Sequence, residues 1–256
     1  MNEQALYATH QKEVAKWDAL AGDVTDERLR LKPGDDFWKY AERTNTLVGI
    51  NEFFGKLEGK RVLEVGCGLG QIAALMARSG AEVTAFDLSK NSVATSRRRS
   101  ELNSLSNRID FVVAAGEAFP FENDCFDILF GKAILHHVDV SFGSSDLYRV
   151  LKPGGKAAFV EPLGMNPLLN FVREYVPYPN KNPRGEDRPL SYEDIYAWGN
   201  GYRDFHFREI RLLSMIERGL GFGKQIPFLR RADEFLLKHF PILRRYCRYA
   251  VLYMVK

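Results

Sequence analysis

The sequence predicts an α/β fold with a doubly wound, mostly parallel sheet. The first observation is a short apolar run, Val62–Val65, that stops at a glycine-rich turn and leads into a helical pattern. The second is that the next apolar run ends on an acid, Asp87. The third is a regular alternation of strand-like and helical runs as far as Glu161. Strand, glycine loop, helix, strand and acid are typical of the front half of a nucleotide-binding unit.

Composition limits the function classes. A chain of 256 residues with 45% hydrophobic and 27% charged residues is an ordinary soluble globular protein with a sizeable core. A net charge of +3 is too small to indicate nucleic acid binding. No apolar run approaches the roughly 20 residues that span a bilayer, and the N-terminus shows no secretory signal, so we expect a cytoplasmic protein. The three cysteines match no metal-ligand spacing, so we expect free thiols and no metal site.

The N-terminal half contains most of the regular pattern. Residues 1–35 carry a weak helical pattern around Val14, Trp17 and Leu20, which predicts either a loosely packed helix or a lid over a cleft. A helical spacing of apolar residues continues over 36–54. Strands are expected at 61–66, 82–87, 108–114, 125–131 and 155–161, and helices at 70–79, 90–103 and 144–151. Ser89 is the expected N-cap of the second of these helices. The turn Pro153-Gly154-Gly155 is expected to start the fifth strand.

The regular alternation of strand-like and helical runs ends after Glu161. The segment 162–202 is proline-rich and is expected to be an insertion over the cleft, with a short helix that begins at Ser191 and a capping-box acid at Asp194. A strand within 203–215, a helix at 229–240 and a strand at 249–255 predict an antiparallel C-terminal hairpin, which makes seven strands in all. The expected organisation is therefore an N-terminal lid or helix at 1–35, a cofactor-binding core at 36–161, an acceptor-pocket insertion at 162–202, and strands and a helix at 203–256 that complete the same domain.

The spacing of the glycines distinguishes between nucleotide ligands. A dinucleotide site needs glycine at the sixth position of the loop, where this chain has Gln71, and no phosphate-loop pattern is present. Glu64, just before the loop, would repel a phosphate and favour a cation. The expected ligand therefore has a ribose for Asp87 and a positively charged group near Glu64.

Five ordered motifs resemble the class I S-adenosylmethionine-dependent methyltransferases, in particular the small-molecule group that includes ubiquinone/menaquinone-biosynthesis enzymes. They are Val62-Leu63-Glu64-Val65-Gly66-Cys67-Gly68-Leu69-Gly70, Asp87-Leu88-Ser89, Phe126-Asp127-Ile128-Leu129, Leu135-His136-His137-Val138 and Leu151-Lys152-Pro153-Gly154-Gly155. The resemblance covers about residues 37–161 and implies a Rossmann-like fold. It also implies S-adenosyl-L-methionine as methyl donor and S-adenosyl-L-homocysteine as product.

The resemblance implies a set of cofactor-binding residues. Asp87 would accept hydrogen bonds from both ribose hydroxyls, and Gly116 would present its backbone N–H to the adenine. The family's aspartate that holds the adenine amino group is replaced here by Ala115, so a neighbouring residue or a water is expected to take over. The complete implied set is Glu64, Gly66, Cys67, Gly68, Gly70, Asp87, Leu88, Ala115, Gly116, Glu117, Gly131 and Lys132.

Two histidines are the candidates for chemistry. A hydroxyl acceptor must lose its proton during methyl transfer, and histidine titrates near neutrality. His136 and His137 follow the fourth strand, and in a helical segment they point about 100° apart, so one of them is expected to face the cleft, with His137 preferred as base. In the alternative interpretation both histidines only fix the shape of the loop by bonding to its backbone. Expected acceptor contacts are Glu161, Phe171, Tyr175 and Tyr178.

The sequence therefore predicts a methyltransferase for a small molecule such as a sugar, a polyketide or a quinone-like intermediate, acting at oxygen. The alternatives are N- or C-methylation of a small molecule or lipid-linked intermediate, a non-catalytic S-adenosylmethionine-binding subunit, and, only if the glycine loop is misread, a nicotinamide-dependent oxidoreductase. No nucleic acid partner is expected. Residues 203–256 carry 12 Lys/Arg against 5 Asp/Glu, which indicates peripheral contact with anionic lipid or with an acidic acceptor, or simply a solvated face.

Overall fold

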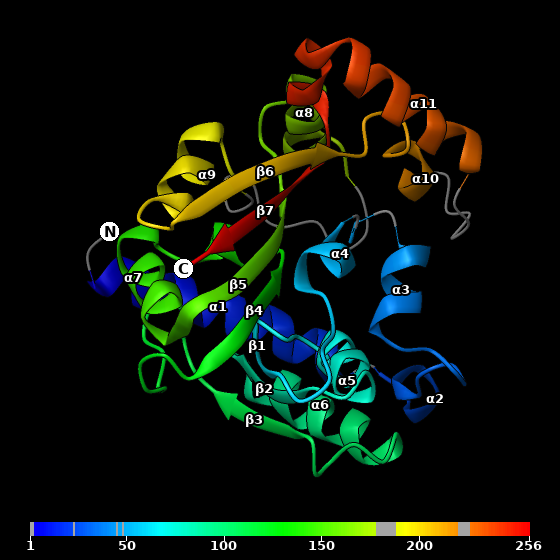
Figure 1. The fold of residues 1–256 in the computed structure, drawn as a ribbon. Helices are drawn as coiled ribbons and strands as arrows, with labels where there is room; N and C mark the ends of the chain where they lie inside the picture. Colours follow the sequence, from blue (N-terminus) through cyan, green and yellow to red (C-terminus); the bar gives the residue numbers. More distant parts are fainter. Residues whose placement is uncertain (1–2, 23, 45, 48, 178–187, 220–225) are drawn as a thin grey trace.

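The computed structural model describes residues 3–22, 24–44, 46–47, 49–177, 188–219 and 226–256. Seven strands form one sheet in the order β3-β2-β1-β4-β5-β7-β6 (Figure 1). β1 to β5 are parallel, and β7 runs antiparallel to both of its neighbours. The predicted fold class is confirmed. The strands are β1 (Arg61–Val65), β2 (Glu82–Asp87), β3 (Ile109–Val113), β4 (Phe126–Lys132), β5 (Leu151–Pro162), β6 (Asp204–Ile210) and β7 (Tyr249–Val255).

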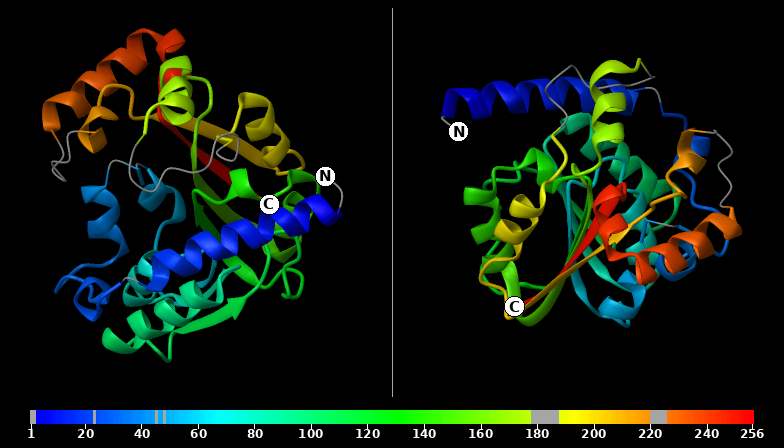
Figure 2. Two further views of the ribbon diagram at one scale, coloured as in Figure 1. Left: turned by 180° about the vertical axis from the view of Figure 1, so that it is seen from behind. Right: turned by 90° about the horizontal axis from the view of Figure 1, so that it is seen from above.

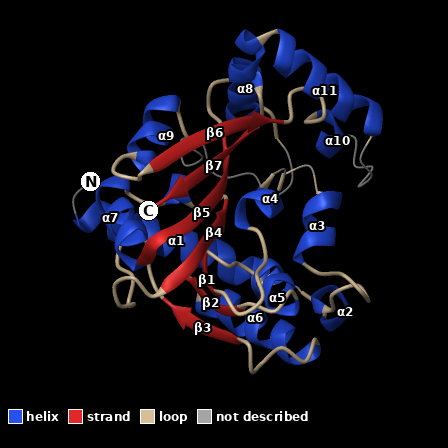
Figure 3. Cartoon of the chain, viewed as in Figure 1, coloured by secondary structure: helices blue, strands red, loops and turns tan. Residues whose placement is uncertain are grey.

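Helices cover both faces of the sheet (Figure 3). Alternate strand residues point to opposite faces, so Val62 belongs to one buried cluster and Leu63 to the other. The first cluster is closed by α3 (Phe37–Arg43), α4 (Ile50–Phe54), α5 (Gln71–Arg78) and α6 (Lys90–Leu102), and the second by α7 (Val140–Val150) and α9 (Tyr192–Gly199). This is why the inner strands read as continuous apolar runs rather than as an alternation.

Local capping places several helices where the sequence predicts them. Ser89 is the N-cap of α6, and its side chain accepts a hydrogen bond from the backbone N–H of Ser92. Ser191 and Asp194 form the predicted capping box at the start of α9. Each bond satisfies an N–H that a helix leaves without an intrahelical partner.

Three boundaries differ from the prediction. The helical pattern over 36–54 is split into α3, which ends at Arg43 before the extended Thr44, and α4, which begins after Gly49 in a left-handed conformation (φ 77°). The helix expected at 144–151 begins earlier, where Asp139 caps α7. The turn at Gly154 (φ 74°) lies inside β5 rather than before it, and there the register with β4 shifts. Tertiary pairing with β4 and β7 recruits residues that local turn chemistry alone would exclude from a strand.

The remaining elements lie around the sheet edges. α1 (Glu3–Gly22) packs on α6 and crosses the front of the molecule in the left view of Figure 2. The other short elements are α2 (Asp26–Leu29), the 3₁₀ turn η1 (Leu135–His137), α8 (Pro167–Tyr175), α10 (Ile216–Gly219), α11 (Pro227–His239) and the 3₁₀ turn η2 (Pro241–Tyr246). No helix among the described residues is long and apolar enough to cross a membrane.

Candidate cofactor and acceptor site

The glycine loop joins β1 to α5 at the carboxyl end of the sheet. Gly66, Gly68 and Gly70 have φ values of 67°, 52° and 69°, in the left-handed region that residues with a Cβ seldom adopt. A Cβ on Gly66 would lie 2.7 Å from the Ile134 side chain, whereas a Cβ on Gly68 would meet no atom within 4 Å. Gly66 is therefore required by packing. Gly68 leaves an open approach to the main chain, which suits a ligand that lies against the loop.

Asp87 ties the end of β2 to this loop. Its Oδ2 accepts a hydrogen bond from the Gly68 N–H (2.8 Å) and its Oδ1 accepts one from the Ser89 N–H (3.0 Å). Burial raises the pKa of Asp87, and the two backbone N–H groups oppose that rise. The carboxylate also lines a cleft at this edge. Asp87 is thus held in a fixed position where it can face a ribose.

Glu64 provides a buried carboxyl behind the loop. It is 4% exposed, and its Oε2 has no hydrogen-bond partner among the described residues. Burial raises its pKa to about 8, against the lowering effect of the Ala73 N–H, and the nearby charge of Asp87 raises it further. A buried oxygen without a partner is costly. Glu64 does not line the cleft, so a contact between its carboxyl and a cationic group of a ligand stays a prediction.

The segment after β3 contributes the next wall of the cleft. Gly116 and Glu117 line it, together with Ala114, whereas Ala115 does not. The Glu117 Oε2 lies 3.1 Å from the Nε2 of His10, which comes from α1. Glu117 is therefore a carboxylate of this wall of the cleft, two residues after Ala115. It is positioned by a residue that is remote in the sequence.

The carboxyl end of β4 forms the opposite wall. Lys132 and His137 line the cleft here, and Leu88 lines it from the β2 side. Gly131 does not line the cleft, since a Cβ there would lie 2.7 Å from the Phe159 ring, so its role is to let β5 pack closely. Cys67 and Gly70 are not lining residues either. Cys67 is a buried free thiol whose pKa is raised by burial, which makes it an unreactive small filler.

The two histidines have different surroundings. The Nδ1 of His136 lies 2.7 Å from Glu161 Oε2, and Glu161 Oε1 accepts hydrogen bonds from the N–H groups of Ile134 and Leu135. His136 is 5% exposed and Glu161 is fully buried, so this pair fixes the turn after β4. His137 lines the cleft, and its Nδ1 lies 3.3 Å from Glu13 Oε1 of α1. One histidine is held inside the turn and the other faces the cleft.

α1 supplies residues that the sequence analysis did not assign to the site. His10, Glu13 and Trp17 line the cleft from this helix, and Asp18 accepts hydrogen bonds from the Ser89 hydroxyl and the Asn91 N–H. The N-terminal segment is therefore a helix with side chains in the wall of the cleft, and its action as a lid stays a prediction. The spacing of His10, Glu13 and Trp17 is helical, and this is the signal that could have identified them.

The residues expected to contact the acceptor are dispersed. Glu161 is buried under the β4 turn, and Phe171 and Tyr175 lie exposed on α8. None of them lines the cleft. Tyr178 lies outside the described residues. An acceptor role for these four residues stays a prediction.

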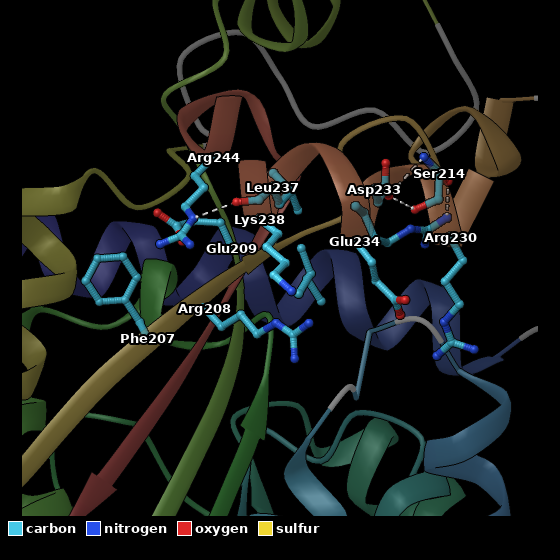
Figure 4. A pocket seen from close by; sticks show the side chains of 12 residues that line it. Phe207, Arg208, Glu209, Ser214, Arg230, Asp233, Glu234, Leu237, Lys238 and Arg244 are labelled. Atoms are coloured by element: carbon cyan, nitrogen blue, oxygen red, sulfur yellow. Dashed lines mark hydrogen bonds between the residues drawn. The ribbon is translucent and has the colours of Figure 1, made fainter. Parts of the chain in front are cut away.

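A second pocket of about 450 Å³ lies at the far edge of the sheet, between β6 and α11. Lys238 and Glu234 descend from α11, and Arg208 extends from β6 beneath them (Figure 4). Asp233 accepts hydrogen bonds from the N–H groups of residues 212–214 and from the Ser214 hydroxyl. This pocket holds none of the motif residues. Among the described residues no group of three or more His, Cys, Asp or Glu could hold a metal ion.

Comparison with known proteins identifies the family of the core of the chain. Residues 63–159 match the family described as methyltransferase domain. The chain is 34% identical over 162 residues to the ubiquinone biosynthesis O-methyltransferase of Alkalilimnicola ehrlichii, covering 62% of each protein. It is 40% identical over 110 residues to the ubiquinone/menaquinone biosynthesis C-methyltransferase of Geobacter sulfurreducens, covering 41% of this chain and 42% of that one. The chain thus spans less than two thirds of the length of these curated relatives.

The fold has solved counterparts. The geranyl diphosphate C-methyltransferase of Streptomyces coelicolor A3(2), solved with Mg²⁺, geranyl diphosphate and S-adenosyl-L-homocysteine, aligns with a TM-score of 0.59. The alignment covers 85% of this chain and 78% of that one at 14% identity, so it shows the fold alone. The expected resemblance to class I S-adenosylmethionine-dependent methyltransferases is confirmed for the core of the chain.

Proposed function

We propose, from the premise that residues 63–159 are a class I methyltransferase domain, that this protein transfers a methyl group from S-adenosyl-L-methionine to a small-molecule hydroxyl. The observation that carries the proposal is the composition of one cleft. Gly68, Asp87 and Glu117 line its nucleoside side, and His137 lines it from the β4 turn. A site that only bound the cofactor would not need an imidazole at that position.

The residues present fit the proposed cofactor. The open space at Gly68 lets the ligand lie against the loop, and Asp87, which lines the cleft beside it, would face the ribose. When bound, the cofactor supplies a methyl group that positive sulfur has already activated. The chain then has to align the acceptor, and such positioning can supply about 7–11 kcal/mol of barrier reduction.

His137 is the proposed base. With its Nδ1 proton directed at Glu13 Oε1, its Nε2 is left as the proton acceptor. This nitrogen would take the hydroxyl proton while the methyl carbon exchanges its bond to sulfur for a bond to the acceptor oxygen, with S-adenosyl-L-homocysteine as the leaving group. Glu13 fixes the tautomer and stabilises the imidazolium that results. His136 takes no part, because it does not line the cleft and is held inside the turn by Glu161.

The relatives include both an O- and a C-methyltransferase. A carbon or nitrogen acceptor is the second candidate, and a non-catalytic binding subunit is the third. We also propose that the basic C-terminal region makes peripheral contact with a membrane and that no nucleic acid takes part. The names of the curated relatives support a quinone-like acceptor.

The test is incubation of the protein with methyl-labelled S-adenosylmethionine and cell extract, followed by mass spectrometry of the labelled product. A labelled methyl ether supports the proposal. A product that carries the labelled methyl group on carbon or nitrogen would overturn the hydroxyl acceptor and support the second candidate. Tight cofactor binding without any labelled product would leave only the binding subunit.

A further inference from the structure

Exposed apolar side chains gather on three elements that follow the cofactor core. Of the thirteen large hydrophobic residues that are exposed in the described part of the chain, eight belong to α8, to α11, to η2 or to the residues that end these helices. They are Leu168, Phe171, Tyr175, Val176, Phe228, Phe235, Phe240 and Ile242, with exposed fractions from 39% to 75%. A concentration of exposed apolar side chains in one region indicates an interaction site.

α8 is an amphipathic helix without a buried residue. Leu168, Phe171 and Tyr175 recur at helical spacing and are 68%, 55% and 57% exposed. Asn166 caps the helix, and its side chain also donates a hydrogen bond to the Tyr246 carbonyl of η2 (2.7 Å). α8 is therefore fixed to η2 at its start while its apolar face points away from the protein core.

α11 shows the same arrangement. Its inner side is anchored by Asp233, which is 6% exposed and caps the 212–214 turn. Phe228 and Phe235 lie seven residues apart, hence on one side of the helix, and are 75% and 58% exposed. In Figure 1, α8 and α11 both lie at the top of the molecule. Two amphipathic helices thus turn aromatic side chains outward at the same end of the protein.

The charge of this region is complementary to an anionic surface. α11 and η2 carry five Lys/Arg residues against two acids, and one of the acids is the buried Asp233. Arg231 and Lys238 are exposed on the helix that presents Phe228 and Phe235. Aromatic side chains on one face with basic residues beside them are the pattern of a helix that lies in a membrane interface. Basic residues next to a bilayer are attracted by its anionic headgroups.

We propose that α8, α11 and η2 form a docking surface for an anionic lipid bilayer, and, resting on the proposed methyl transfer, that the acceptor is a membrane-dissolved molecule. One part of this surface, α8, follows the strand β5, whose end borders the turn that carries His137. β5 leads directly into α8, and the same strand end carries Glu161, which holds the turn of His136 and His137. A bilayer on this surface would therefore bring a lipophilic acceptor to the β4 and β5 side of the cleft.

Co-sedimentation with vesicles tests the docking surface. The intact protein should bind vesicles of phosphatidylglycerol and phosphatidylcholine at least tenfold more tightly than vesicles of phosphatidylcholine alone. The paired changes Phe228→Ser with Phe235→Ser, and Leu168→Ser with Phe171→Ser, should each weaken binding at least tenfold. Phe142→Ser is the matched control, because Phe142 is 52% exposed on α7, and binding should persist. Arg231→Glu with Lys238→Glu should abolish the preference for anionic vesicles. Lys56→Glu, at an exposed lysine just after α4, should keep it.

Several outcomes would overturn the docking proposal. These are absence of binding to anionic vesicles, an equal loss in the Phe142→Ser control, or a dimer in solution that the phenylalanine changes convert to a monomer while no vesicle binding is seen. The source of the acceptor is tested by labelling separated membrane and soluble fractions with methyl-labelled cofactor. Label only in the soluble fraction overturns the membrane acceptor. Label in neither fraction, with vesicle binding intact, counts against the proposed function and supports the docking surface.

Discussion

Glu13 of α1 and His137 of η1 lie 3.3 Å apart, Oε1 to Nδ1, and both residues line the cofactor cleft. The pair joins the N-terminal helix to the turn after β4. The pKa of Glu13 is lowered to about 2, because the hydrogen bond and the charge of His137 outweigh burial, which acts in the opposite direction. The fold thus stabilises the ionised form of Glu13, which adds to the free energy of unfolding. This stabilisation is present above about pH 4.5 and is lost as the pH falls toward 2.

His137→Ala should lower kcat by about 100-fold or more, since general base catalysis contributes typically 10²–10⁴-fold. The affinity for S-adenosylmethionine, measured by calorimetry, should change little, because Asp87 and the glycine loop remain. Glu13→Gln should reduce kcat less, as it keeps a hydrogen bond and removes only the charge. Full activity of His137→Ala would return this histidine to a structural role.

His136→Ala should lower the stability of the protein. Its removal leaves Glu161, which is fully buried, without the partner of its Oε2. Breaking such a buried pair costs about 3–5 kcal/mol, which corresponds to a fall in Tm of roughly 6–20 °C for a chain of this size. Differential scanning calorimetry of the two alanine variants is the measurement. Equal Tm values for them would contradict the different surroundings of the two histidines.

Asp87→Ala should weaken S-adenosylmethionine binding by at least about tenfold, because hydrogen bonds to a charged group contribute about 1.5–3 kcal/mol each. Asp87→Asn, which keeps one carbonyl oxygen, should have an intermediate affinity. Asp110→Ala on the neighbouring strand β3 is the control, since Asp110 is exposed and does not line the cleft. Unchanged affinity of Asp87→Ala in calorimetry would remove the ribose assignment.

Glu64→Gln should change the dependence of stability on pH. The folded pKa of Glu64, about 8, lies above the ordinary value of 4.5, so the folded state keeps a proton that the unfolded state loses. The free energy of unfolding of the intact protein should therefore fall relative to Glu64→Gln by up to about 1.4 kcal/mol per pH unit between these values. Urea titrations of both proteins at pH 5, 6, 7 and 8 measure the difference. Parallel curves would show that Glu64 is ionised in the fold.

Sequence patterns alone predict the parallel core, the glycine loop, the end of β2 at Asp87, the N-cap Ser89 and the capping-box acid Asp194. These features follow from hydrophobic periodicity, from the backbone freedom of glycine and from hydrogen bonds between residues a few positions apart, all of which are local.

The residues that complete the site could be identified only from the folded structure. His10 and Glu13 enter the cleft because α1 packs across α6, and the roles of His136 and His137 separate because Glu161 reaches one of them from β5. Such contacts join segments that are far apart in the chain, and no local pattern encodes them. The sequence analysis expects Phe171 and Tyr175 to contact the acceptor, whereas in the structure they lie exposed on α8 and do not line the cleft. Their position also depends on contacts between distant segments.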